Sequence, residues 1–271
     1  MGSIERPKVM GIVNATPDSF SDGGRFLAAD AALAHARRLI ADGADILDLG
    51  AESTRPGAEP VPAEVEIARL VPLIQAIRAE SAVPISVDTM KPQVARAAMA
   101  AGANIWNDVA ALRFSADAPA AAAELGCDVI LMHMQGQPRT MQAEPHYDDV
   151  TAEVCAFLAE RAEAAMAAGV ARDRIWLDPG IGFGKHTTCH NLPLLARLDQ
   201  VVALGLPVLL GASRKAFIGA VDGGAPADQR LGGSIAVALA GAAAGVAAVR
   251  VHDVRETVQA LTVQAAIRNA G

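Results

Sequence analysis

Short apolar runs that end in polar, chemically capable residues recur along this chain, and this repetition most constrains its fold. Runs typical of strands lie at about residues 8–13, 45–50, 84–88, 104–107, 128–133, 174–178, 207–211 and 247–252. Runs such as ILDLG and VLLG are almost continuously apolar, which is typical of parallel strands covered on both faces. The segments between the runs have an apolar residue every three or four positions, as helices packed on a sheet do.

Eight such strand and helix units predict an α/β fold, a (β/α)8 barrel formed by a single domain over residues 1–271. The loops that leave the carboxyl ends of the strands are expected to be long after strands 1, 2, 5, 6 and 7, at 14–27, 51–64, 134–148, 179–191 and 213–227. A doubly wound open sheet is the competing architecture, but the first strand lacks the glycine-rich fingerprint of that fold. Because parallel strands point the same way, the polar residues at their ends should meet on one face.

Composition and charge exclude several classes of partner. A formal net charge of −7 argues against nonspecific binding to nucleic acid or to an anionic membrane. The three cysteines are odd in number and widely separated, which favours a reducing compartment. No signal segment or bilayer-spanning apolar run is visible, so we expect a cytoplasmic protein that acts on small molecules.

Three strand-end residues favour a phosphate group and its metal ion. Arg250 and His252 are two apart on one strand and therefore share a face, where a guanidinium and an imidazole can bind phosphate oxygens. A structural contact between His252 and Asp253 is the alternative. Asn14, at the end of the first strand, can give a neutral oxygen to Mg²⁺.

Four other residues favour a flat heterocycle. Asp88, Asn107 and Asp178 follow different strands and can together satisfy the N–H and C=O edges of a small ring system. Lys215, in a Ser-Arg-Lys triplet, is a point charge for a ligand, a Schiff-base amine or a surface lysine. Each of the first three can instead merely cap a helix.

The loops add groups that can cover a ligand. Phe20 lies among flexible polar residues in the first loop, where an aromatic ring can close over a flat molecule. The second loop has hydroxyls and one guanidinium, Arg55, which can also simply pair with Glu52 or Glu59. A cluster of His186, Cys189 and His190 lacks the paired spacing of a structural zinc site.

Several segments, in order over residues 8–254, resemble the bacterial dihydropteroate synthases, a family of pterin-binding barrels. These segments are MGIVNATPDSFSDGG, AESTRPGAEPV, SVDTMKPQVA, WNDVAAL, LMHMQGQPRTMQ, LDPGIGFGK, GASRKAFIG and VRVHDV. The resemblance implies a (β/α)8 enzyme that joins 6-hydroxymethyl-7,8-dihydropterin pyrophosphate to p-aminobenzoate in folate biosynthesis and releases pyrophosphate. It also implies a magnesium ion, a homodimer and binding of sulfonamides, which are analogues of p-aminobenzoate.

The same resemblance implies roles for individual residues. The pterin would be held by Asp88, Asn107, Asp178 and Lys215, and the pyrophosphate by Asn14, Arg250 and His252, with Asn14 on the metal. The p-aminobenzoate site would contain Phe20, Asp22, Thr54, Arg55, Pro56, Phe183 and Ser213. The implied catalytic set is Asp22, Asp88, Asp178, Lys215, Arg250 and His252. One departure is Ala216, where family members commonly have serine.

The chemistry of these residues supports the reaction independently. Loss of pyrophosphate from a methylene carbon spreads positive charge over the pterin, so acids are needed near the ring and cations near the leaving group. We expect a largely dissociative displacement without a covalent enzyme intermediate. The alternatives are a methyltetrahydrofolate corrinoid methyltransferase, which has no leaving pyrophosphate, a Schiff-base aldolase using Lys215, and a catalytically silent pterin-binding homologue. An alanine-rich helix pair at about 233–244 and 254–269 is the expected dimer contact.

Overall fold

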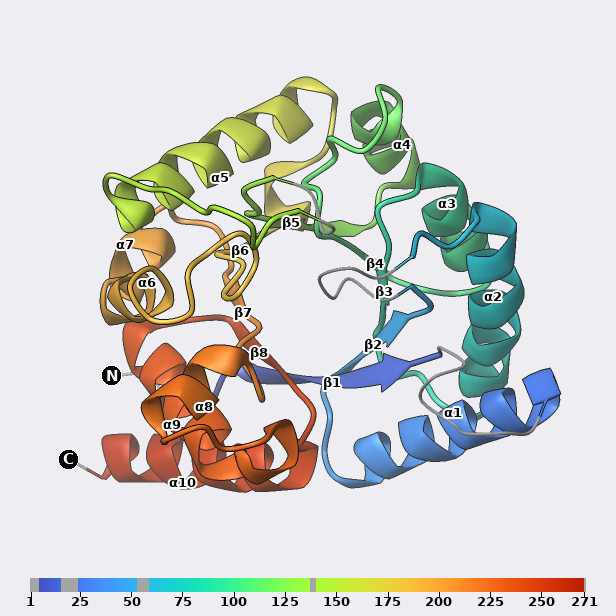
Figure 1. Cartoon of the computed structure of the whole chain (residues 1–271). Helices are drawn as coiled ribbons and strands as arrows, with labels where there is room; N and C mark the ends of the chain where they lie inside the picture. Colours follow the sequence, from blue (N-terminus) through green and yellow to red (C-terminus); the bar gives the residue numbers. More distant parts are fainter. Residues whose placement is uncertain (1–4, 16–23, 53–58, 137–139, 271) are drawn as a thin grey trace.

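A computed structural model describes residues 5–15, 24–52, 59–136 and 140–270 of the chain. Its centre is a ring of parallel strands surrounded by helices (Figure 1). The strands are β1 (Lys8–Asn14), β2 (Ile46–Gly50), β3 (Ile85–Asp88), β4 (Ile105–Asp108), β5 (Asp128–Met132), β6 (Ile175–Asp178), β7 (Leu209–Leu210) and β8 (Ala248–Val251). Every predicted strand is therefore present.

The ring closes through its shortest strand. The sheet runs in the order β6-β5-β4-β3-β2-β1-β8-β7, and Leu177 of β6 pairs in parallel with Val208, beside β7. The predicted (β/α)8 barrel is thus confirmed, and the open doubly wound sheet is excluded. The strand predicted at 207–211 is shorter than expected, because Pro207 has no N–H to donate and enters the ladder only through its carbonyl, which accepts from the N–H of Leu177 at 2.8 Å.

The helices lie outside the strands and cover them from solvent (Figure 1). They are α1 (Gly24–Ala41), α2 (Ala63–Glu80), α3 (Pro92–Ala100), α4 (Ala118–Leu125), α5 (Val150–Ala167), α6 (Asn191–Ala196), α7 (Leu198–Val202), α8 (Ala216–Val221), α9 (Leu231–Ala244) and α10 (Val254–Asn269). Short helix α8 lies inside the segment predicted as a loop at 213–227. Within the described ranges, we find no helix with the length and apolarity needed to cross a membrane.

The barrel interior changes from apolar to polar along the strands. A separate buried cluster of Met10, Ile46, Ile105, Ile130, Leu209 and Ala248, with Trp176 packed against it, forms an apolar floor. Side chains two positions further along a strand share the same face. Two positions beyond five of these residues lie Asp48, Asn107, Asp178, Gly211 and Arg250. The polar layer therefore stands directly above the floor, toward the carboxyl ends of the strands.

Candidate active site

The guanidinium of Arg250 forms the centre of this polar layer. Its Nε donates to Asp48 Oδ2 at 2.6 Å, and its Nη2 donates to Asp88 Oδ2 at 3.0 Å. Asp48 is fully buried and also accepts a long hydrogen bond of 3.4 Å from Asn107 Nδ2. Burial lowers the pKa of Arg250, but the two carboxylates outweigh it and hold that pKa above its usual range. Two acids around one base leave this centre with an excess of negative charge.

The carboxylate of Asp88 is protonated more readily than an exposed aspartate. Burial raises the pKa of Asp88 to about 7, although the attraction of Arg250 opposes the rise. Asp88 also lies directly beside Asn107 in the parallel register of β3 and β4. The structure therefore brings together these two predicted pterin-binding residues and Arg250.

Asp178 lies on the same wall of the barrel as Arg250. Its Oδ1 accepts from the N–H of Gly180 at 2.7 Å, and its Oδ2 is directed toward Gly211. A Cβ added at Gly211 would lie 3.6 Å from Asp178 Oδ2 and 3.9 Å from Arg250 Cβ, so a glycine separates the two side chains. Burial raises the pKa of Asp178 above its usual range.

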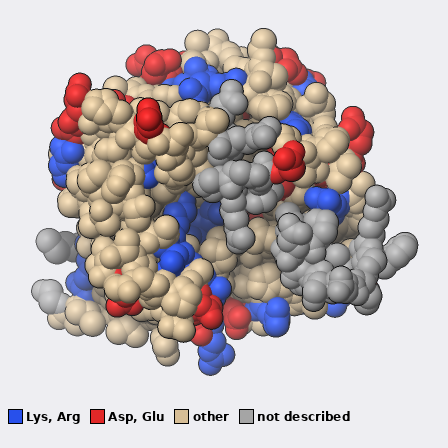
Figure 2. Space-filling model, viewed as in Figure 1, with Lys and Arg blue, Asp and Glu red and all other residues tan. Residues whose placement is uncertain are grey.

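Lys215 and Phe183 lie against each other although they come from different loops. The Lys215 ammonium is 4.2 Å from the centroid of the Phe183 ring and donates to the carbonyl of Ile181. Burial lowers the pKa of Lys215 to about 8, against the attraction of Asp178. A predicted pterin-binding residue thus contacts a predicted p-aminobenzoate-binding residue. Figure 2 shows lysine and arginine atoms inside a hollow near the middle of this face.

The loop after β6 is fastened by a second buried lysine. Lys185 is 1% exposed, and its Nζ lies 2.8 Å from His133 Nδ1, 2.9 Å from Gly180 O and 3.1 Å from Phe183 O. Burial lowers the pKa of Lys185 well below its usual value. The loop also lies so close to its neighbour that a Cβ on Gly180 would be 1.9 Å from His133 O. Phe183 is therefore placed by a rigid, tightly packed loop.

The turn after β7 joins Ser213 to His252. Ser213 Oγ lies 3.0 Å from His252 Nδ1 and accepts from the backbone N–H of His252 at 3.3 Å. Between Ser213 and Lys215, Arg214 has a φ of 58°, a left-handed conformation that is strained for a residue with a Cβ atom. Its side chain forms an ion pair with Asp253, so that carboxylate is engaged by Arg214.

Of the remaining predicted residues, only Asn14 lies within the described ranges. Asn14 is exposed at the end of β1. The residues predicted for the first and second loops, Phe20, Asp22, Thr54, Arg55 and Pro56, lie outside the described residues. In the part of the chain that is described, no three histidine, cysteine or acidic side chains form a group suited to a metal ion.

The chain matches a known protein family over most of its length. The model of the pterin binding enzyme family matches residues 10–252. The dihydropteroate synthase of Escherichia coli K12 is 48% identical over 267 residues, which are 98% of this chain and 94% of that protein. The chain belongs to the dihydropteroate synthase family. A structure of the Xanthomonas albilineans enzyme with 4-aminobenzoic acid matches with a TM-score of 0.92 and 52% identity, covering 98% of this chain and 94% of that one.

A further member of the dihydropteroate synthase family was solved with a sulfonamide drug. This Yersinia pestis enzyme has a TM-score of 0.91 and 46% identity, and the match covers 97% of this chain and 94% of that one. The resemblance inferred from the sequence motifs is thereby confirmed.

In this dihydropteroate synthase family member, sequence reasoning missed Asp48 and Lys185 as parts of the site. Asp48 is the one acid in the apolar run ILDLG, and an acid inside a buried strand needs a partner. The sequence therefore indicates that Asp48 has a partner, but it does not show which residue the partner is. Lys185 ends the motif LDPGIGFGK, and nothing in its spacing indicates a buried lysine side chain.

Proposed function

We propose that this protein joins 6-hydroxymethyl-7,8-dihydropterin pyrophosphate to p-aminobenzoate and releases pyrophosphate and 7,8-dihydropteroate. The observation that carries the proposal is the position of Asp178 and Arg250 on either side of Gly211, with Asp88 and Asn107 nearby. Acids, an amide and a base from four different strands then meet at one end of a barrel whose relatives are dihydropteroate synthases over nearly their whole length.

The acids and the amide bind the pterin. Asp178 Oδ2 is not occupied by the Gly180 N–H and accepts from the N–H groups of the pyrimidine ring. Asn107 offers both donor and acceptor atoms, and Asp88 accepts from a further ring N–H. The Lys215 ammonium donates to the ring carbonyl. Such matched polar edges give specificity, because each unmatched buried group would cost about 1–3 kcal/mol.

The bases receive the leaving group. Arg250 uses one nitrogen for Asp48 and another for Asp88, and its remaining N–H donors bind pyrophosphate oxygens together with His252. Asn14 would supply one oxygen to a magnesium ion bound with the pyrophosphate. When bound, that ion neutralises the charge that grows on the departing oxygens.

The reaction breaks one C–O bond and forms one C–N bond. The electron pair of the C–O bond leaves with the pyrophosphate oxygen, while the lone pair of the p-aminobenzoate nitrogen attacks the methylene carbon, and that nitrogen then loses a proton to solvent. Asp88 and Asp178 stabilise the positive charge on the ring in the dissociative transition state. Lys215 forms no covalent bond to the pterin.

The second substrate is held by the loops. Phe183 and Ser213 form part of the p-aminobenzoate site, and Phe20, Asp22, Thr54, Arg55 and Pro56 complete it. Sulfonamides bind at the same site because they resemble p-aminobenzoate.

Pyrophosphate release from the pterin substrate tests the function directly. With Mg²⁺, release should depend on p-aminobenzoate and yield 7,8-dihydropteroate in equal amount. Binding of the pterin without turnover would favour the catalytically silent homologue. Methyl transfer from methyltetrahydrofolate to a corrinoid would favour the methyltransferase. A borohydride-trapped adduct on Lys215 would favour the aldolase.

A homodimer formed through α9 and α10 is a further part of the proposal. These helices present an apolar groove that includes Ile235, Leu239 and Ala260, and its residues Val263 and Ile267 are 54% and 68% exposed. Large exposed apolar side chains on neighbouring helices favour a protein contact. Light scattering should give twice the chain mass, and Ile267→Glu should give the monomer. A monomeric wild-type protein at micromolar concentration would refute the dimer.

A cytoplasmic location completes the proposal. Cys127, Cys155 and Cys189 are all free thiols, which supports a reducing compartment. Fractionation of the native cells should find the protein in the cytoplasmic fraction, and recovery from an oxidising compartment would contradict the proposal.

A further inference from the structure

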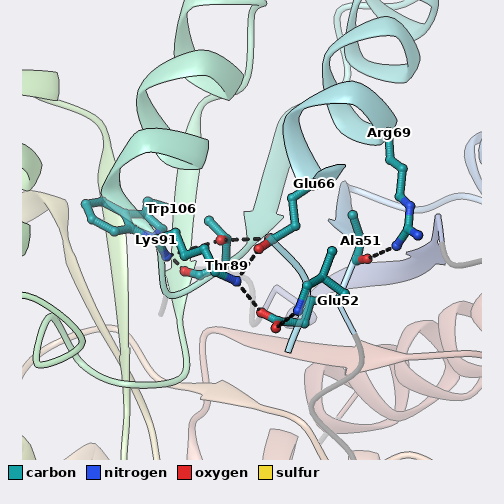
Figure 3. Close-up of polar contacts among 8 residues, drawn as sticks. Ala51, Glu52, Glu66, Arg69, Thr89, Lys91 and Trp106 are labelled. Carbon is teal, nitrogen blue, oxygen red and sulfur yellow. Dashed lines mark hydrogen bonds and ion pairs between the residues drawn. The ribbon is translucent and has the colours of Figure 1, made fainter. Parts of the chain in front are cut away.

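A buried cluster of three charges, Lys91, Glu52 and Glu66, takes no part in the proposed reaction (Figure 3). The Lys91 ammonium, at the N-terminus of α3, lies 2.7 Å from Glu52 Oε2 and also donates to Glu66 Oε1. The three side chains are 11%, 9% and 0% exposed, respectively. Burial lowers the pKa of Lys91, but its two ion pairs outweigh burial and raise that pKa overall. Lys91 is therefore a fixed cation between two acids.

Through Glu52 the cluster holds both ends of one loop. Glu52 Oε1 accepts from the backbone N–H of Val61 at 2.8 Å, while the other oxygen binds Lys91. Arg69 of α2 donates to the carbonyl of Ala51 at 2.8 Å (Figure 3). The segment that leaves β2 at Glu52 and returns at Val61 is thus fastened at both ends to a single carboxylate.

Through Glu66 the cluster reaches the next two strands. Thr89 Oγ1 donates to Glu66 Oε2 at 3.0 Å, and Trp106 Nε1 donates to the carbonyl of Thr89 at 2.8 Å (Figure 3). Thr89 directly follows Asp88, and Trp106 directly precedes Asn107. One network therefore joins the base of the loop after β2 to the strand ends that bear two predicted pterin-binding residues.

Stability alone does not account for this network. Removing charges from water costs about as much as their mutual attraction returns, so a buried ion pair contributes little net stability compared with apolar residues of the same volume. This cluster also has two acids for one base. The network instead fixes the distances between the ends of β2, β3 and β4, since each hydrogen bond has a narrow range of length and angle.

We propose that Lys91 is a positioning residue for the second substrate, acting through Glu52 on the ends of the 52–61 segment relative to Asp88 and Asn107. The inference rests on the proposed function, because the family resemblance assigns Thr54, Arg55 and Pro56 of this segment to the p-aminobenzoate site. Lys91 is paired with Glu52 and Glu66 and is not among the residues assigned to either substrate. Its removal should therefore weaken the use of p-aminobenzoate more than the use of the pterin.

Steady-state kinetics of Lys91→Met, Glu52→Gln and the double variant test the inference. Lys91→Met should raise KM for p-aminobenzoate about tenfold and change KM for the pterin pyrophosphate less than about twofold, as expected for a coupled buried contact. In the Glu52→Gln background, the same change should add less than about threefold, because Lys91 acts through Glu52. Lys91→Arg should recover part of the loss. Equal effects on both KM values, or fully additive effects, would overturn the inference.

Hydrogen exchange without substrates separates this inference from the proposed function. Exchange of the Val61 amide should be faster in Lys91→Met than in wild type, whether or not the wild type makes dihydropteroate. The matched control is Arg96→Met, on the same helix, because Arg96 pairs with the exposed Glu124 and not with this network. Unchanged Val61 exchange in Lys91→Met would overturn the positioning role. If Val61 exchanged faster in Lys91→Met but the wild type made no dihydropteroate, only the proposed function would be refuted.

Discussion

Replacement of Asp178 by asparagine should separate binding from stability. The substitution keeps the size of the side chain, and its oxygen can still accept the Gly180 N–H that lies 2.7 Å from Oδ1. The atom that changes is Oδ2, which is directed toward Gly211 and the barrel interior. There an amide NH₂ would face the N–H groups of the pterin, so that a donor meets a donor.

The expected loss of pterin affinity can be worked out from the change at Oδ2. A hydrogen bond to a charged group contributes about 1.5–3 kcal/mol, which corresponds to about 10- to 150-fold in affinity. Because the new amide also leaves a buried ring N–H unpaired, we expect the upper part of this range. Isothermal titration with the pterin pyrophosphate measures the dissociation constant directly.

Although Asp178→Asn should weaken pterin binding, its folded state should be as stable as that of wild type or more stable. Burial raises the pKa of Asp178, so the folded protein binds a proton that the unfolded chain releases above about pH 4. This contribution to stability is complete below that pH and is lost as the pH rises through the folded pKa. Asparagine does not ionise, so it avoids the cost of burying a carboxylate charge. At alkaline pH, Asp178→Asn should therefore unfold at the same temperature as wild type or at a higher one.

A matched control lies at the opposite end of the barrel. Asp128 begins β5 and forms an ion pair with the half-exposed Arg174 at 3.0 Å. Asp128→Asn should leave pterin affinity unchanged. The reasoning would be refuted if Asp178→Asn bound the pterin as tightly as wild type, or if its loss of affinity simply followed a loss of folded protein.

Further predictions concern pH, packing and the second substrate. Since burial lowers the pKa of Lys215 to about 8, kcat/KM should fall above about that pH, and Lys215→Arg should move this limb to higher pH in initial-rate profiles; an unmoved limb would assign it to another group. Burial raises the pKa of Asp108 to about 7 despite two backbone N–H donors, so its contribution to stability is complete below about pH 4 and is lost as the pH rises through about 7. Asp108→Asn should flatten that part of a plot of Tm against pH, and an unaltered slope would contradict it. Lys185→Met removes a buried donor from the carbonyls of Gly180 and Phe183, of which, within the described residues, only Gly180 O keeps a second donor, the N–H of Phe183, and should cost about 1–3 kcal/mol in urea unfolding, while a smaller loss would show that the loop is held elsewhere. Ala216→Ser should lower KM for p-aminobenzoate about fivefold, the equivalent of about 1 kcal/mol from one hydroxyl, and an unchanged KM would place the carboxylate away from residue 216.

Strand β7 shows how much of the fold can be predicted from local sequence. The apolar run PVLLG predicts a strand, and the structure has one there, but its continuous part is Leu209–Leu210, and Val208 joins the ring through a single bridge to Leu177. Its length depends on the partners that β6 and β8 offer, which are distant in the chain. Periodicity therefore predicts that a strand exists and leaves its extent to the neighbouring strands.

The site divides in a similar way. Asp88, Asn107 and Asp178 were predicted because each follows an apolar run or ends one, and Arg250 because it shares a strand face with His252. Asp48, inside such a run, was not predicted, although it is the fully buried partner of Arg250. An acid in the middle of a buried strand indicates that a partner exists, but the sequence does not say which residue faces it across the barrel.

The sequence by itself determined that eight parallel strands form a barrel and that its polar residues gather at one end, because strand direction and side-chain alternation are local properties. Only the tertiary structure decided the pairing of those residues. Arg250 and Asp48 are 202 positions apart, and Lys185 and His133 are 52 apart. Which side chains meet inside a closed barrel depends on the register and tilt of all its strands together, and no single segment of the chain contains that information.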